Sequence, residues 1–210
     1  MSWIDQFVLR RGDSIFAPFG QVVAAAERLA RVAEDRTGLP RHSYDLVGAA
    51  GYRARVLAEL ARVLEEDVNV LSRRADEVLR PGVDGVGRER VLTVVFTEAV
   101  RAHAMLMDTC SQLLALCEDL MVLRRAKSRL ELMGAIEALR GAASTSHLTV
   151  LANLPRITDV TLYDQLSAGL ETLDGTLALA NRLTSTLRSD TRYGRPGAGP
   201  TGLGRLAQIS

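Results

Sequence analysis

The chain has 210 residues, with 26 Lys and Arg against 25 Asp and Glu and a formal net charge of +1. This length fits one domain, and a hydrophobic fraction of 47% excludes a largely disordered chain. The balance of charge argues against a dedicated nucleic-acid-binding protein, which would carry a strong basic excess.

Helical periodicity dominates the first half of the chain. A short helix is predicted over residues 2–10, and a second begins near Pro18 and runs through an Ala-rich stretch to about residue 36. Residues 37–45 form a connector with Gly and Pro as helix breakers. A long helix follows over 45–79, and the sequence PGVDGVG at 81–87 is the clearest internal linker.

The second half of the chain continues in helices. A helix nearly forty residues long is predicted over 88–126, the next spans 128–153, and Thr158 or Asp159 caps a last one that runs to about residue 188. No segment alternates with the period of two that strands require. We therefore expect an all-α fold, an antiparallel helical bundle of five to six helices with two of them long, over residues 1–189. Residues 190–210, rich in Gly and Pro, are expected to form a flexible tail.

The chain carries no predicted signal peptide or membrane span, so we expect a cytoplasmic protein without a membrane partner. Its two cysteines, Cys110 and Cys117, lie seven residues apart on one helix. They would be about 10 Å apart along the axis, too far for a disulfide. We therefore expect both cysteines to be reduced thiols in the core. We also expect no metal site, since the three histidines are not paired at ligand spacing.

Residues 148–173, LTVLANLPRITDVTLYDQLSAGLETL, carry the most specific pattern. A helix ends at Asn153-Leu154, a turn ends at Ile157-Thr158-Asp159, and a helix with Asp164-Gln165 follows. This segment is similar to the closing part of the cyclodeaminase/cyclohydrolase family, which includes the cyclodeaminase half of formiminotransferase-cyclodeaminase and methenyltetrahydrofolate cyclohydrolases. Weaker similarities occur upstream in the same order as in the family: Phe7-Val8, Ala17-Pro18 with Gly20, residues 64–71 and residues 128–142. The resemblance covers most of residues 3–189 and identifies a diverged relative.

The chain departs from the family at its first turn. The family has Pro-x-Pro-Gly-Gly-Gly-Ser, a turn that lets backbone N–H groups face a ligand. Here one glycine, Gly20, remains beside Pro18 and Phe19. We expect these three residues to line the substrate pocket, with the ring of Phe19 narrowing it against a flat pterin. The resemblance also places Glu131 in the role of an acid and Thr149 in the place of an Asn in the substrate site.

Chemistry at an imine-like C–N bond needs proton transfers near neutral pH, which a carboxylate or a histidine supplies. Glu65 and Asp67 match the closely spaced acidic residues of the family. Asp67 lies near the edge of the apolar stripe, where partial burial would raise its pKa. A solvated charged face is the alternative for both.

Two histidines complete the catalytic candidates. His103 lies on an apolar stripe, where a hydrogen-bonded core residue is the alternative to catalysis. His147 lies in the stretch ASTSH, which fits either close helix packing or a polar cavity. Asn153 and the basic cluster around Arg124 are candidates for substrate binding, the cluster for an anionic tail. For the cluster, a solvated helix end is the alternative.

The leading interpretation is a cyclodeaminase/cyclohydrolase-like enzyme acting on a folate one-carbon adduct or a related small molecule by metal-free acid–base chemistry, with no cofactor. One alternative is a relative in specialised metabolism that catalyses cyclisation or loss of water or ammonia on a non-folate substrate. The other is a non-catalytic helical scaffold that has lost the site. Members of the family pair, and the longest predicted helix offers more apolar face than a small bundle covers, so we expect a homodimer.

Overall fold

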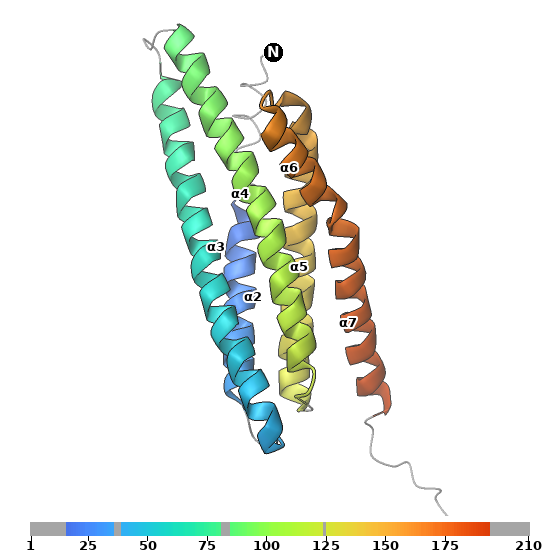
Figure 1. Ribbon diagram of the computed structural model, residues 1–210. Coiled ribbons are helices and arrows are strands. Elements are labelled where there is room, and N and C mark those ends of the chain that lie inside the picture. The colour runs from blue at the N-terminus through green and yellow to red at the C-terminus, as the bar shows by residue number, and fades with distance from the viewer. Residues whose placement is uncertain (1–15, 36–38, 81–84, 124, 194–210) are drawn as a thin grey trace, which may run out of the picture.

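A computed structural model describes residues 16–35, 39–80, 85–123 and 125–193. In these residues the chain is a bundle of six α-helices without strands, which confirms the all-α prediction (Figure 1). The helices are α2 (Ala17–Glu34), α3 (Tyr44–Val78), α4 (Gly85–Leu120), α5 (Ala126–Asn153), α6 (Val160–Glu171) and α7 (Leu173–Tyr193). Two short 3₁₀ turns, η1 (Arg41–Ser43) and η2 (Leu154–Arg156), precede α3 and follow α5. The helix predicted over 2–10 lies outside the described residues.

Three predicted boundaries differ from the structure. Helix α4 begins at Gly85 and so includes the last three residues of the predicted linker, and it ends at Leu120, six residues before the predicted end. The last helix is not continuous: Asp159 caps α6 through a hydrogen bond from the Leu162 N–H, as expected, but the helix ends at Glu171. A new helix, α7, begins at Leu173 and ends at Tyr193. Residues 190–193, predicted to belong to the flexible tail, are therefore helical.

Local features weaken the helix near residue 172. Gly169 and Gly175 flank it, and glycine costs about 1 kcal/mol relative to alanine inside a helix. The Thr172 hydroxyl donates to the Gly169 carbonyl oxygen at 2.7 Å, which occupies an acceptor near the end of α6. The resulting bend lets α6 and α7 both pack against α4 and α5 (Figure 1).

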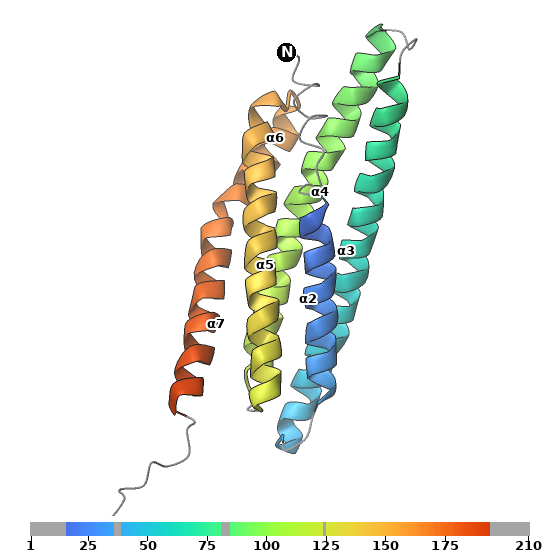
Figure 2. The same ribbon diagram turned by 180° about the vertical axis from the view of Figure 1, so that it is seen from behind.

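Helices α2 and α3 run antiparallel and approach each other closely at one end. A Cβ added to Gly51 would lie 2.6 Å from the Cβ of Ala33, closer than two carbon atoms can pack. Glycine at position 51 is therefore required for this contact. At the other end of α2, Gly20 lies beside Glu65 of α3. Helices α3, α4 and α5 all extend beyond the start of α2, so α2 begins part-way along the bundle (Figure 2).

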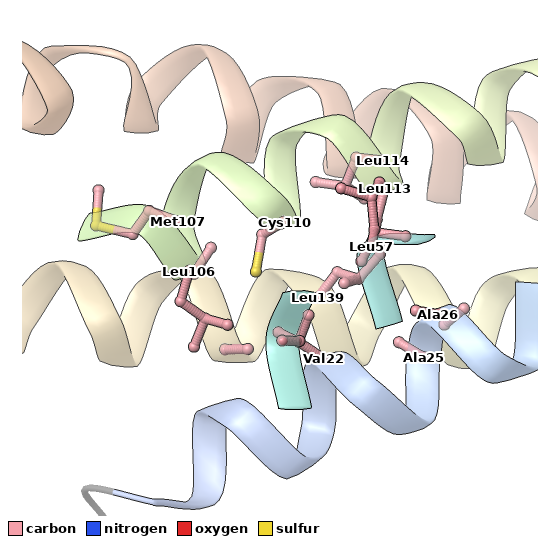
Figure 3. Packing of buried hydrophobic residues seen from close by; sticks show 14 of the residues in the cluster. Val22, Ala25, Ala26, Leu57, Leu106, Met107, Cys110, Leu113, Leu114 and Leu139 are labelled. Atoms are coloured by element: carbon pink, nitrogen blue, oxygen red, sulfur yellow. The ribbon is translucent and has the colours of Figure 1, made fainter. Parts of the chain in front are cut away.

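The core is built from apolar side chains at helical spacing on all six described helices. Figure 3 shows residues of this cluster from α2, α3, α4 and α5: Val22, Ala25, Ala26, Leu57, Leu106, Met107, Cys110, Leu113, Leu114 and Leu139. Both cysteines are buried and free, as predicted, and burial raises the pKa of the Cys110 thiol to about 12 and that of Cys117 higher still. In the part of the chain that the structure describes, no helix is long and apolar enough to cross a membrane.

Candidate functional site

The first turn of α2 lies between α3 and α5 (Figure 2). Pro18 and Phe19 are buried there, whereas Gly20 is exposed. The carboxylate of Glu65 on α3 reaches this turn, and its Oε1 lies 3.8 Å from the position that a Gly20 Cβ would occupy. Pro18 in this turn has no N–H, and the Phe19 N–H donates to the Phe16 carbonyl oxygen at 3.1 Å, but the helix dipole makes this end of α2 positive. A half-buried carboxylate therefore stands beside an electropositive turn of backbone.

The ring of Phe19 packs into the core instead of standing at the surface. It is fully buried, and its centroid lies 5.0 Å from that of His103 on α4, with the two rings tilted by 58°. Gly20, not Phe19, is the exposed residue of the turn.

His103 is also buried, and it is held from the other side by α5. Its Nδ1 lies 3.3 Å from the Ser146 hydroxyl, whereas its Nε2 is buried with no hydrogen-bond partner among the described residues. Burial lowers the pKa of His103 to about 4. The ring is therefore neutral at pH 7, and it is poorly matched to proton transfer near neutral pH, where an acid or base works best with a pKa near the working pH. It acts as a neutral hydrogen-bonding group.

His147 points in a different direction. It follows Ser146 directly, so its side chain leaves α5 about 100° away from the one that meets His103. It is also about 120° around α5 from Gly141, which lies against Gln21 of α2. The ring is half-buried, and its Nδ1 has no hydrogen-bond partner in the described parts of the chain. The structure therefore does not bring His147 to the first turn of α2.

The polar stretch around His147 bonds mostly to its own helix. The hydroxyls of Ser144, Thr145 and Thr149 donate to carbonyl oxygens four residues earlier, at 2.9, 3.0 and 3.1 Å. The Asn153 amide donates to the Thr149 carbonyl oxygen at 2.6 Å. Ser146 is fully buried, and its hydroxyl contacts His103 of α4. Thr149 and Asn153 lie one and two turns beyond it, on the part of α5 that extends past the start of α2 (Figure 2).

Asp67 lies in a separate groove between α3 and α4. The groove has a volume of about 240 Å³, and its walls are Leu64, Asp67, Val70, Leu71, Glu98, Arg101, Ala102 and Met105. Asp67 is exposed and leaves α3 about 200° away from Glu65, so these two carboxylates face different surfaces. Arg101 donates to both Glu98 oxygens, at 2.8 and 3.0 Å. The groove residues of α4 were not singled out from the sequence, because nothing local marks which face of α4 borders α3.

Two further candidates lie toward the opposite end of the bundle. Glu131 forms an ion pair with Arg28 of α2 at 3.1 Å, about 22 Å along α5 from Ser146. At the start of α5, both Asp35 oxygens accept from Arg125, each at 2.8 Å, so part of the basic cluster already has an anionic partner in the chain. Arg124 itself lies outside the described residues. Within the described ranges, no three His, Cys, Asp or Glu side chains are grouped so that they could hold a metal ion.

Comparison with known proteins shows a similarity of fold but not of sequence. No family model matches the chain, and no curated protein matches its sequence. Among solved structures, the fold is similar to that of formiminotetrahydrofolate cyclodeaminase from Thermotoga maritima, with a TM-score of 0.72 and 13% sequence identity. The match covers 88% of this chain and 93% of that protein. The chain therefore has a cyclodeaminase-like fold.

Proposed function

We propose that the chain is a cyclodeaminase/cyclohydrolase-like enzyme that makes or breaks a C–N bond by general acid–base chemistry. The observation that carries the proposal is the Glu65 carboxylate beside Gly20 on the first turn of α2. The turn corresponds to the glycine-rich turn of the family in sequence, and the fold is similar to that of a protein named formiminotetrahydrofolate cyclodeaminase. The substrate we propose is a folate one-carbon adduct or a related small molecule.

Glu65 is the residue proposed to move the proton. Its carboxylate can accept a proton from the attacking group and return it to the leaving nitrogen, while the positive end of the α2 dipole attracts a polar or anionic part of the substrate. Thr149 and Asn153 lie along α5 beyond the turn and are proposed to contact the substrate. His103, neutral and bonded to Ser146, is proposed to position the turn through its packing against Phe19.

Turnover of methenyl- and formimino-tetrahydrofolate by the full chain tests the proposal. Replacing the carboxylate in Glu65→Gln should lower turnover by roughly 10²–10⁴-fold, the usual contribution of one acid or base. Glu66→Gln is the matched control, because Glu66 is exposed and bonded to Arg73 on the same helix. Asp67→Asn tests the other member of the acidic pair. Equal activity of the Glu65 and Glu66 variants would reject Glu65 as the acid or base.

A second candidate, a helical scaffold without activity, is favoured by Phe19. Its fully buried ring fills the space beneath the turn with apolar packing against His103. A protein of this kind would neither turn over the two folate substrates nor bind them in calorimetric titration. Binding without turnover would instead favour the relative in specialised metabolism, acting on a non-folate substrate.

A further inference from the structure

The groove between α3 and α4 is not used by the reaction proposed above, since Glu65 leaves α3 toward α2. Helices α3 and α4 lie side by side along one edge of the bundle (Figure 1). The groove runs along α3 from Leu64 to Leu71 and along α4 from Glu98 to Met105, so it is about 10 Å long. Its volume of about 240 Å³ is below the roughly 300–1,000 Å³ of pockets for drug-sized ligands. A ligand of this groove would therefore be small.

The floor and the rims of the groove are apolar. Leu64 and Ala102 are buried and form the floor, whereas Val70 and Met105 form the rims and are 48% and 45% exposed. Because the Ala102 side chain is a single methyl group, space remains between the larger side chains around it. Transfer of an apolar group from water into such a space is favourable. The groove therefore favours a ligand with an apolar body.

The charged side chains of the groove leave one carboxylate free. Glu98 accepts two hydrogen bonds from Arg101, at 2.8 and 3.0 Å, so these two side chains form an ion pair. Asp67 on the opposite wall is exposed and has no hydrogen bond or ion pair with any described residue, Arg101 included. Two carboxylates and one guanidinium give the groove a formal net charge of −1. The groove is therefore complementary in charge to a ligand with a single positive charge.

We infer that the groove between α3 and α4 binds a small organic cation that carries one positive charge on an apolar body. The charged group, an ammonium or a guanidinium, pairs with the Asp67 carboxylate, and the apolar body lies against Leu64, Leu71 and Ala102. A metal ion does not fit, because Asp67 is the only free carboxylate among the described residues that line the groove and a metal ion needs several oxygen ligands. An anion would meet the net negative charge, and a neutral molecule would leave Asp67 without a partner.

Titration of the ¹⁵N-labelled full chain with three matched probes tests the inference by nuclear magnetic resonance. The probes are n-hexylammonium, 1-hexanol and hexanoate, which share the same alkyl chain and differ in charge. At millimolar concentrations and constant ionic strength, n-hexylammonium should shift the amide resonances of the groove residues of α3 and α4 in a saturable way, and should leave those around Gly20 in place. It should bind about two- to five-fold more tightly than 1-hexanol, the usual range for one exposed ion pair. Hexanoate should bind more weakly than 1-hexanol.

Substitutions separate the charge from the apolar walls. Asp67→Asn keeps the shape of the side chain, so it should bind 1-hexanol as the wild type does and lose the preference for n-hexylammonium. Glu66→Gln is the matched control: it removes the same charge from the next residue, which is bonded to Arg73 outside the groove, and it should keep the preference. Ala102→Leu should weaken the binding of both probes, because the larger side chain fills the groove. The Asp67→Asn comparison does not depend on that variant, since Asp67 is exposed and lies outside the core.

Three results would overturn the proposal. The first is the absence of saturable shifts at the groove residues of the wild type, which would also follow if another chain or another segment of this chain covers the groove. The second is equal affinity of the wild type for n-hexylammonium and 1-hexanol. The third is an Asp67→Asn variant that keeps the preference for n-hexylammonium. None of these measurements uses turnover, so the inference stands or fails independently of the proposed reaction.

Discussion

Acidification should destabilise the protein through one buried ring, that of His103. The folded ring takes up a proton with a pKa of about 4 because of its burial, against an ordinary value of 6.5 in the unfolded chain. As the pH falls below 6.5 the unfolded state therefore binds more protons than the folded state, and the free energy of unfolding falls. One pKa unit corresponds to about 1.4 kcal/mol. The shift of this ring should therefore lower the free energy of unfolding by about 2 kcal/mol between pH 7 and pH 5, and by about 3 kcal/mol between pH 7 and pH 4.

Urea denaturation followed by helical circular dichroism at pH 7, 6 and 5 measures this effect. His103→Gln should be less stable than the wild type at pH 7, because it disturbs the contacts with Phe19 and Ser146. The variant should lose less stability on acidification than the wild type. The difference between their free energies of unfolding should therefore be about 2 kcal/mol smaller at pH 5 than at pH 7. His42→Gln, exposed in η1, should keep the pH dependence of the wild type.

The reasoning is refuted if the wild type and His103→Gln lose the same stability between pH 7 and pH 5. Nuclear magnetic resonance of the imidazole protons of the wild type gives a reading that does not depend on any variant. The resonance of His103 should titrate near pH 4, and a midpoint near 6.5 would mean that the ring is not buried in a neutral form.

Two other features of the core give direct tests. Gly51→Ala should destabilise the protein by about 1–3 kcal/mol in the same denaturation experiment, because the added methyl would lie 2.6 Å from the Ala33 side chain. Gly87→Ala in α4 is the control: no atom lies within 4 Å of the added Cβ, so this variant should be neutral or stabilising. Cys110 and Cys117 should react with a thiol reagent only after unfolding, since both are fully buried with raised pKa values; reaction of the native protein would show that the core opens.

The helices were predictable because the signals that make them are local. Apolar residues at helical spacing, Pro18 in a first turn and Asp159 as a cap are all visible in the sequence, and the structure has helices in these places. The break at residue 172 was not predicted, because two separated glycines reduce helix stability by amounts that packing elsewhere routinely overrides. The bend depends on how α6 and α7 meet α4 and α5, which is a tertiary property.

The candidate site was harder to predict because its parts are distant in sequence. His103 and Ser146 lie 43 residues apart, and no local pattern predicts that the ring meets this hydroxyl. Phe19 was expected to line a pocket, but only the packing of four helices determines that its ring turns into the core. The direction in which the His147 side chain leaves α5 follows from its position next to Ser146. The direction of the Ser146 side chain, however, is known only once the fold is known.

The run Glu65-Glu66-Asp67 shows how one turn of α3 serves three surfaces. Because consecutive residues leave a helix about 100° apart, Glu65 reaches the first turn of α2, Glu66 faces solvent, and Asp67 borders the groove with α4. The two carboxylates therefore share one turn of α3 yet point about 200° apart, so a substitution at one leaves the surroundings of the other in place. If Glu65 moves the proton, Glu65→Gln should lower turnover by roughly 10²–10⁴-fold, whereas Asp67→Asn should leave turnover close to that of the wild type. Loss of turnover in Asp67→Asn alone would instead place the chemistry in the groove between α3 and α4.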